Sequence, residues 1–294
     1  MTVSAITVLT VTHNSSSILE GFLSSVERSS TSDVDVVIVD SGSTEAEAVA
    51  TERIASSHDA VFRRMERNAG YGAGINAAAR LASDAELLLI CNPDVELGEG
   101  SLDILADRLR SDRTIGAVGP RILNLDGTVY PSARRLPSTR LGIGHAIFAN
   151  VWTDNPWSRR YRNADALGTG GTDVGWLSGA CLLMRAEDFV SLGGFDEGFF
   201  MYFEDVDLGR RIGLHGLRNV YVPDAVVRHI GGHSTEDVSA VMLQAHHRSA
   251  YRYFAIRHPE WYLAPARLVV RAGLGVRSAW ASMRSRRTDS RRSG

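Results

Sequence analysis

Lysine is absent from this sequence, and all 32 of its basic residues are arginines. Such one-sided usage is typical of a GC-rich genome rather than of a chemical requirement. The acidic residues bring the formal net charge to −2, so the chain as a whole gives no argument for nucleic-acid binding. From Arg257 onward, however, nine arginines stand against two acids, which makes the C-terminus a local basic zone.

Cysteine is scarce too: the sequence has only Cys91 and Cys181, both in apolar runs. We therefore exclude a disulfide framework and expect two buried thiols in a reducing compartment. No apolar run reaches the roughly 18 residues of a membrane span, and the first residues lack the basic segment and cleavage site of a signal peptide. These absences predict a cytoplasmic protein whose contact with a membrane is peripheral.

Strand and helix patterns alternate through the first hundred residues. Apolar runs at 5–11, 34–39 and 87–91, and a shorter one beginning at Val61, are each followed by residues at helical spacing. Continuous runs of this kind are typical of strands buried on both faces, and their alternation with helices predicts a parallel, doubly wound sheet. With 294 residues, 44% of them hydrophobic, the chain can bury a large core.

Polar residues directly follow these strands, at the edge where open α/β sheets bind ligands. Asp40 either caps the next helix or accepts hydrogen bonds from a nucleoside. The glycine-rich stretch 70–74 has the wrong spacing for the dinucleotide-binding motif, and we interpret it as a loop whose backbone approaches a diphosphate. Asp94, which follows Pro93, is either a turn residue or an oxygen ligand for Mg²⁺ or Mn²⁺.

A cluster of acids follows an aromatic run in the segment from Phe199 to Arg211. Glu204, Asp205 and Asp207 lie within four positions, at the start of a helical pattern. Acids in a first helical turn complement the helix dipole, but three of them beside apolar walls repel one another and resist desolvation. Because such surroundings raise a carboxyl pKa, we predict a general base at the mouth of a pocket.

The second half of the chain continues with strand patterns. Residues 176–184 predict one strand, and 219–222 and 225–229 predict two short ones. His229 ends the last of them, as Asp94 follows an earlier one. A lone histidine is more often structural, yet an aspartate, a histidine and diphosphate oxygens together would complete a site for a divalent metal.

Three segments lack a strand pattern. Residues 140–173 mix aromatic and polar residues, the composition of an acceptor cleft, a lid or an ordered loop. Residues 237–258 and 262–284 predict helices, the second of which alternates apolar residues with arginines. That alternation suits the surface of an anionic membrane or a solvated peripheral helix, and residues 285–294 predict a disordered basic tail.

An ordered set of motifs resembles the inverting glycosyltransferases of family 2, which have the GT-A fold. The motifs are TVTHNS, VVIVDSGST, RNAGYGAGINAA, LLLICNPDVEL, WLSGACLLM, GGFDEGFFMYFEDVDLGRR and VRHIGGHS, and they span residues 4–235. The resemblance implies a Rossmann-like, mostly parallel α/β sheet flanked by helices. Its domain would cover residues 1–234, with a nucleotide-binding half at 1–120 and an acceptor-binding half at 121–234. Residues 235–284 would form a helical, membrane-proximal extension.

The resemblance also implies residue roles. Asp94 takes the place of the family's two-acid metal motif and, with His229, would hold Mg²⁺ or Mn²⁺, although Asn92 stands where relatives have a second acid. Asp205 would be the general base, supported by the two neighbouring acids, and an exchange of roles among the three stays open. The nucleotide sugar would contact Val11, His13, Asp40, Ser41, Asn68, Gly70, Gly72, Asn92 and Asp94. The acceptor would contact Trp176, Ser178, Gly179, Arg134, Arg135 and Arg248.

A closer resemblance is to the actinobacterial rhamnosyltransferases of cell-wall arabinogalactan assembly. It is carried by YPSARRLPS, VGWLSG, FMYFEDVDLG and AHHRSAY. It implies transfer of L-rhamnose from dTDP-β-L-rhamnose to O3 of N-acetylglucosaminyl-diphospho-decaprenol, with inversion at the anomeric carbon. A polyprenyl-diphosphate acceptor would place the enzyme at the cytoplasmic face of the plasma membrane.

Other interpretations stay open at this level. The same fold accommodates another donor, such as UDP-galactofuranose or another hexose donor. A non-catalytic, nucleotide-sugar-binding membrane scaffold would keep the fold without the chemistry, although Asp94, Asp205 and His229 are all present. We expect no nucleic-acid partner, because the arginine-rich tail has no interleaved aromatic residues. A homodimer is neither indicated nor excluded.

Overall fold

The computed structural model describes residues 5–137, 171–230, 240–275 and 277. Its strands are β1 (Ile6–Thr12), β2 (Val34–Ser41), β3 (Val61–Met65), β4 (Leu87–Cys91), β5 (Val95–Leu97), β6 (Ile115–Leu123), β7 (Val129–Tyr130), β8 (Ala133–Arg134), β9 (Thr172–Val174), β10 (Trp176–Leu177), β11 (Cys181–Arg185) and β12 (Arg218–His229). Its helices are α1 (Ser16–Arg28), α2 (Glu45–Ser57), α3 (Tyr71–Leu81), α4 (Ser101–Arg110), α7 (Ala186–Ser191), α8 (Glu204–Leu214) and α9 (Ala240–Arg257). The 3-10 turn η1 (Trp261–Leu263) and a helix over residues 264–275 follow α9.

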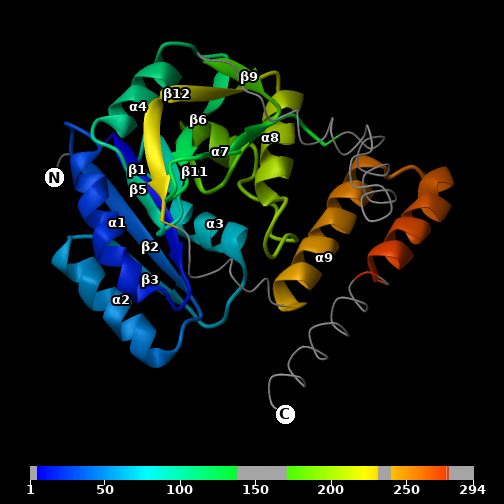
Figure 1. The fold of residues 1–294 in the computed structure, drawn as a ribbon, viewed down its shortest axis with the longest axis horizontal. Coiled ribbons are helices and arrows are strands. Elements are labelled where there is room, and N and C mark those ends of the chain that lie inside the picture. Colours follow the sequence, from blue (N-terminus) through cyan, green and yellow to red (C-terminus); the bar gives the residue numbers. More distant parts are fainter. Residues whose placement is uncertain (1–4, 138–170, 231–239, 276, 278–294) are drawn as a thin grey trace.

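One large sheet forms the centre of the fold (Figure 1). Its strands lie in the order β3-β2-β1-β4-β11-β6-β12-β5, with β7 paired to β6 and β9 to β12. The first four strands are parallel to one another, which confirms the predicted doubly wound arrangement of the first half. β11 comes from the second half of the sequence and lies antiparallel between β4 and β6.

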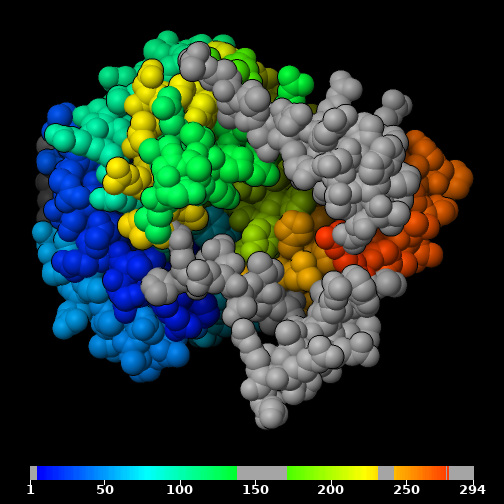
Figure 2. Space-filling view, viewed as in Figure 1, coloured from blue at the N-terminus to red at the C-terminus, as the bar shows by residue number. Residues whose placement is uncertain are grey.

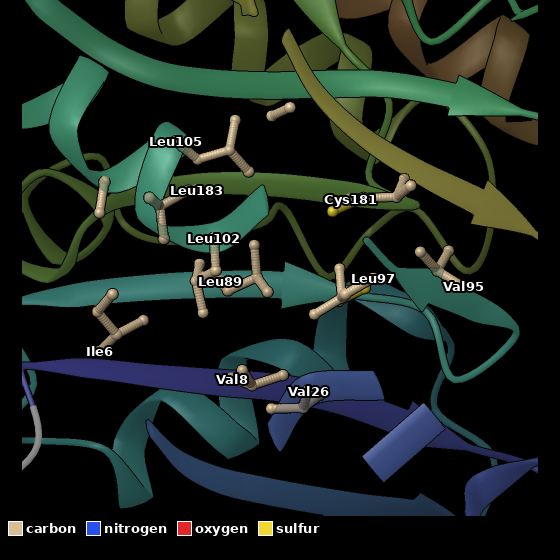
Figure 3. Packing of buried hydrophobic residues seen from close by; sticks show 14 of the residues in the cluster. Ile6, Val8, Val26, Leu89, Val95, Leu97, Leu102, Leu105, Cys181 and Leu183 are labelled. Atoms are coloured by element: carbon tan, nitrogen blue, oxygen red, sulfur yellow. The ribbon is translucent and has the colours of Figure 1, made fainter. Parts of the chain in front are cut away.

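Helices cover both faces of this sheet. The buried side chains of α1, α2 and α4 join one core cluster, and those of α3, α7 and α8 join a second. Within one strand the side chains alternate: Val8 of β1 belongs to the first cluster and Leu9 to the second. Figure 3 shows the first cluster, with Leu102 and Leu105 of α4 facing Leu89 and Leu183 of the sheet.

The two cysteines lie in this core. Cys91 of β4 and Cys181 of β11 are directly opposite each other across the antiparallel pair, and both are free and buried. The expectation of two buried thiols is therefore confirmed. Burial raises the pKa of the Cys91 thiol, which keeps that sulfur protonated and unreactive.

The C-terminal helices lie beside the sheet domain rather than on it. Tyr253 of α9 packs with Phe199 and Val206 in a third, small cluster next to α8. In Figure 2 the atoms of these helices, orange to red, lie at the right-hand edge of the molecule. Among the described residues, no helix has the length and apolar character needed to cross a bilayer.

Three details of the fold differ from the expectations. The stretch 70–74 is not a loop, because α3 begins at Tyr71 and only Gly70 precedes it. Residues 176–184 form two strands in different sheets, separated by a turn at 178–180. The two short strands predicted from 219 to 229 are one strand, β12, with an irregularity between Val222 and Val226. Most of the predicted cleft or lid at 140–173 lies outside the described residues.

Candidate active site

The carboxyl ends of the parallel strands carry a connected group of polar residues. Nδ1 of His13, just after β1, lies 2.9 Å from the backbone oxygen of Ser41 at the end of β2. The Ser41 hydroxyl donates to the amide oxygen of Asn68, which also accepts the backbone N–H of Gly70. The structure therefore brings four of the residues predicted for the nucleotide sugar together at one edge of the sheet.

Asp40 belongs to this edge but is turned into the protein. Its carboxylate is completely buried and accepts hydrogen bonds from the backbone N–H and the hydroxyl of Ser43 and from the hydroxyl of Thr12. Arg64 of β3 adds a charge 4.0 Å away. These contacts show that Asp40 holds the turn after β2, and the cap of α2 is Thr44 rather than Asp40. A contact with a nucleoside stays a prediction.

The start of α3 lies against the segment that leads to the acid cluster. Gly70 has φ +93° and a Cβ there would overlap the backbone oxygen of Phe200, so only glycine fits. The backbone N–H of Tyr71 donates to that same oxygen at 3.1 Å. A glycine in this stretch thus does permit a close approach of backbone, as predicted, but the group that approaches Gly70 is the Phe200 peptide of the protein. In α3, Gly74 leaves room for the side chain of Val11.

Asp94 and His229 come together although they are far apart in sequence. Antiparallel pairing of β12 with β5 puts His229 opposite Val95, and Nε2 of His229 lies 3.0 Å from Oδ2 of Asp94. The nearby carboxylate raises the pKa of His229. Asn92 is fixed next to them through its backbone N–H, which donates to the oxygen of Ala180 at 2.9 Å.

This pair has the properties of a partial metal site. Oδ1 of Asp94 is buried and has no hydrogen-bond partner in the described part of the chain, while Oδ2 of the same carboxylate faces Nε2 of His229. Adjacent ligands at ~2.1 Å from a six-coordinate ion lie about 3 Å apart, which matches the distance between these side chains. The described residues hold no group of three or more metal-binding side chains, so other ligands would come from substrate and water.

Two of the three clustered acids face this end of the molecule. Glu204 is buried, and burial together with the charge of Asp205 raises its pKa to about 8. Burial also raises the pKa of Asp205, against the effect of two backbone hydrogen bonds. These bonds come from the N–H of Gly179 at 3.1 Å and of Val206 at 2.8 Å. The predicted crowding of carboxyl groups with raised pKa values is therefore present.

Asp207 has a different environment. It is buried and forms a 2.7 Å ion pair with Arg211 one helical turn later, and Arg211 also donates to the backbone oxygen of Leu192. This network anchors α8 to the loop after α7. The geometry favours a structural contribution from Asp207, and a direct part in chemistry stays a prediction.

The turn between β10 and β11 borders the acids. Gly179 donates its N–H to Asp205 and accepts the hydroxyl of Tyr71 at 2.6 Å. Ser178 is buried, with its N–H bonded to the backbone oxygen of Ser132. Both residues were predicted on the acceptor side, and both adjoin the candidate base.

The predicted arginines divide into two sets. The guanidinium of Arg134 lies 5.8 Å from the ring centre of Trp176, and its charge lowers the pKa of Asp205. Arg135 and Arg248 are exposed. No hydrogen bond or ion pair joins either of these two to the site in the parts of the chain that are described. Their contact with an acceptor stays a prediction.

Two tyrosines complete the arrangement, and the sequence reasoning missed both. Burial raises the pKa of Tyr130, and the nearby charges of Asp205 and Asp94 raise it further. Its ring is 5.6 Å from that of His229. Tyr71 fixes the Gly179 peptide, and its pKa is raised well above the usual value by burial. The YPSARR motif could have indicated Tyr130, since it adjoins the arginines.

Together these residues can take a proton from a hydroxyl group beside a site for a diphosphate. A desolvated carboxylate held by two N–H groups is a positioned base. The Asp94–His229 pair nearby, in which Oδ1 of Asp94 has no partner among the described residues, can hold a divalent cation.

Comparison with known proteins agrees with this chemistry. The sequence profile described as glycosyl transferase family 2 matches residues 7–193. An N-acetylglucosaminyl-diphospho-decaprenol L-rhamnosyltransferase of Mycobacterium tuberculosis is 41% identical over 283 residues, covering 92% of this chain and 91% of that protein. A rhamnosyltransferase of Escherichia coli is 40% identical over a shorter stretch, 29% of this chain and 32% of its own.

Solved structures show the same fold. The mannosyltransferase PcManGT of Pyrobaculum calidifontis, in complex with GDP-Man and Mn²⁺, superimposes with a TM-score of 0.60 at 20% identity, over 95% of this chain and 72% of its own. GalNAc-T7 with UDP, GalNAc and Mn²⁺ gives a TM-score of 0.62 at 18% identity, over 93% of this chain and 55% of its own. The predicted GT-A fold is therefore confirmed.

Proposed function

Because this chain belongs to glycosyl transferase family 2, we propose that it transfers L-rhamnose from dTDP-β-L-rhamnose to O3 of N-acetylglucosaminyl-diphospho-decaprenol. The observation that carries the reaction type is the convergence of Asp94, His229 and Asp205 at one end of the sheet. The relationship to the mycobacterial rhamnosyltransferase along almost the whole chain supports the choice of donor and acceptor.

Asp205 is the group that takes the proton. Gly179 and Val206 hold its two carboxylate oxygens, so the carboxylate keeps one orientation toward the acceptor hydroxyl. Burial raises its pKa, which makes it a better base than an exposed aspartate. Attack by that hydroxyl from the face opposite the diphosphate inverts the anomeric carbon, and no covalent nucleophile is required.

Asp94 and His229 are the residues that would hold Mg²⁺ or Mn²⁺. The buried Oδ1 of Asp94, which has no partner among the residues described, and the 3.0 Å approach of Nε2 of His229 to Oδ2 fit this assignment. When bound, the ion supplies positive charge against the diphosphate as that group departs. The related folds solved with Mn²⁺ support the choice of a divalent cation.

The remaining residues bind and orient the substrates. The strand-end residues His13, Ser41 and Asn68 would border the nucleoside. Tyr130 and Trp176 would line the part of the site that binds the sugar and the acceptor. Arg134 would face the acceptor's diphosphate, next to the base, where its charge already acts on Asp205.

The C-terminal helices would hold the enzyme on the membrane that contains the lipid acceptor. Trp261, Tyr262, Leu268 and Val269 are all more than half exposed, which is costly in water for such large apolar residues. Arg271 lies on the same segment, with its guanidinium 5.9 Å from the ring of Tyr251. Aromatic and apolar side chains beside arginines suit the interface of an anionic bilayer, at the cytoplasmic face.

A transfer assay tests the proposal. Purified protein and Mg²⁺ or Mn²⁺ would be incubated with a N-acetylglucosaminyl-diphospho-polyprenol analogue and, in turn, dTDP-rhamnose, UDP-galactofuranose and UDP-glucose. We expect a rhamnosylated product from dTDP-rhamnose alone. Asp205→Asn should lower the rate about 100-fold or more, because a positioned base contributes at least that much. Asp94→Ala should abolish transfer, because it removes one of the two side chains proposed to hold the metal.

Asp35→Asn is the matched control, since Asp35 is exposed at the opposite end of β2 and should leave the rate unchanged. A product from another donor only would overturn the rhamnosyl assignment and keep the fold and the base. Binding of nucleotide without transfer from any donor would instead favour a non-catalytic scaffold.

A further inference from the structure

The segment 196–203, which precedes Glu204 and the general base Asp205, ends in an unusual backbone. Tyr202 and Phe203 have φ values of +68° and +67°, although neither is glycine. Side chains with a Cβ rarely adopt this left-handed region, so surrounding contacts must hold it. Glu204 and Asp205 follow at once, as the first two residues of α8. The direction of the Asp205 side chain therefore depends on what holds the segment 196–203.

One side of this segment rests on α3. Tyr71 donates its N–H to the oxygen of Phe200, and Gly70 gives that oxygen room to approach. This contact fixes a single peptide in the middle of the segment. Asn76 of α3 also donates to the side chain of Glu197 at 3.0 Å, so α3 contacts the beginning of the segment as well.

Helix α9 holds the beginning of the segment. Arg252 donates hydrogen bonds to both carboxylate oxygens of Asp196: Nη2 lies 2.8 Å from each oxygen, and Nε lies 3.1 Å from Oδ2. The same guanidinium stacks 5.3 Å from the ring centre of Phe199. It also occupies the space where any side chain on Gly198 would lie. One arginine thus fixes three successive parts of the turn.

Helix α9 also holds the strained end. The hydroxyl of Ser249 donates to the backbone oxygen of Met201 at 2.7 Å. The ring of His246 packs on Tyr202 and Phe203, with centroids 5.4 and 5.5 Å away. Arg252, Ser249 and His246 are spaced three residues apart, so they lie along one face of the helix.

We propose that α9 is a positioning element for catalysis, in which Arg252, Ser249 and His246 hold the left-handed turn that aims Asp205 at the acceptor. None of the three touches a reacting atom in this assignment. This inference rests on the proposed function only in taking Asp205 as the base. It adds that the orientation of Asp205 in the sheet domain depends on α9, the helix that leads to the residues proposed to face the membrane. Loss of α9 contacts should therefore weaken turnover rather than donor binding.

The test compares Arg252→Ala, Arg252→Lys and Ser249→Ala with the whole chain as reference. We expect Arg252→Ala to lower kcat about 10- to 100-fold. The KM for the nucleotide sugar should change less than about threefold, because the residues proposed to bind the nucleotide lie at the ends of β1 and β2, away from α9. Arg252→Lys should recover part of the loss, since it restores the charge but not the bidentate hydrogen bonds to Asp196.

Gly198→Ala should reproduce the defect, because the added methyl group would displace the guanidinium while Arg252 itself is unchanged. Arg53→Ala, at an exposed arginine of α2, is the matched control.

Hydrogen–deuterium exchange supplies a readout independent of the sugar transferred. Faster exchange in peptides covering 196–206, with unchanged exchange in β1 to β4, would support the proposal even if the donor proved to be another sugar. Unchanged kcat and exchange in Arg252→Ala would overturn it. A drop in the thermal stability of Arg252→Ala, with faster exchange throughout the chain, would also overturn the proposal, because it would show that the contact is merely structural. In that case Ser249→Ala, which removes a single hydrogen bond, would show no loss of kcat.

Discussion

Glu204 is the most unusual ionisable residue of the site. Its side chain is buried beside Asp205, one carboxyl oxygen has no partner among the described residues, and its pKa is raised to about 8. At neutral pH it is therefore mostly protonated, so the pair carries a single negative charge. That charge can stay on Asp205, where two N–H groups stabilise it.

Replacement of Glu204 by glutamine should mimic this neutral form. The unfolded chain loses the Glu204 proton near pH 4.5 and the folded protein only near pH 8. Hence the wild type loses stability as pH rises between these values, and the variant does not. We expect Glu204→Gln to gain on the order of 2 kcal/mol over wild type from pH 5 to pH 9, measured by urea unfolding. Transfer at pH 7 should stay within about threefold of wild type.

The exposed Glu99→Gln provides the control for this experiment. A stability difference that does not grow with pH would show that Glu204 is ionised in the folded protein at neutral pH.

The residues of the site were predictable to different degrees. Asp94 and His229 could be inferred because each stands at a strand end, where side chains of an α/β sheet meet ligands. Tyr130 could not, since its position beside His229 depends on the antiparallel pairing of the short β7 with β6. The burial of the Asp40 side chain could not be predicted either, because it depends on hydrogen bonds from Ser43 and from Thr12 of β1.

At the scale of elements, a histidine joins α2 to α1. His58, at the end of α2, lies 2.7 Å from Glu27 and 3.1 Å from Glu20, both on α1. The hydrogen bond to Glu27 is the main cause that raises its pKa, and burial opposes it. The protonated ring therefore links the two helices that cover one end of the first core.

We expect this link to make stability depend on pH. Because the folded pKa of His58 is raised, its contribution is complete below about pH 6.5 and is lost as pH rises through the folded value. His58→Gln should lower the free energy of unfolding by about 0.5–1 kcal/mol at pH 5.5 and by less at pH 9, since both glutamates are exposed and screened. Thermal unfolding at both pH values measures it. An equal loss at both would exclude the charged pair as its origin.

The elements themselves show where sequence patterns reach their limit. The apolar runs of β1 and β4 identify strands unambiguously, since both faces are buried. The run 176–184 looks like one strand, yet the small residues at 178–180 turn the chain from one sheet to another. Neither that turn nor the packing of α9 on residues 196–203 has a local signal, because both depend on distant contacts.

At the scale of the whole molecule, membrane binding is the feature most open to test. Trp261→Ser combined with Leu268→Ser removes two exposed apolar groups from the C-terminal segment. We expect binding to vesicles containing anionic phospholipid to fall about tenfold, because apolar burial and charge both contribute. Cosedimentation measures this. The matched control is Val190→Ser, an exposed apolar residue of α7 in the sheet domain. Equal binding by both variants would exclude this segment as the membrane contact.

The position of β11 in the sheet has a consequence for the integrity of the enzyme. It comes from the second half of the sequence but lies between β4 and β6, two strands of the first half. A polypeptide ending after β6 would keep most of the residues proposed for the nucleotide and yet leave the facing edges of β4 and β6 unpaired at the centre of its sheet. Two separately expressed pieces, divided between β8 and β9, would each lack what the other supplies. Their recombination would pair these two edges and bring the residues proposed for the two substrates together in a single step.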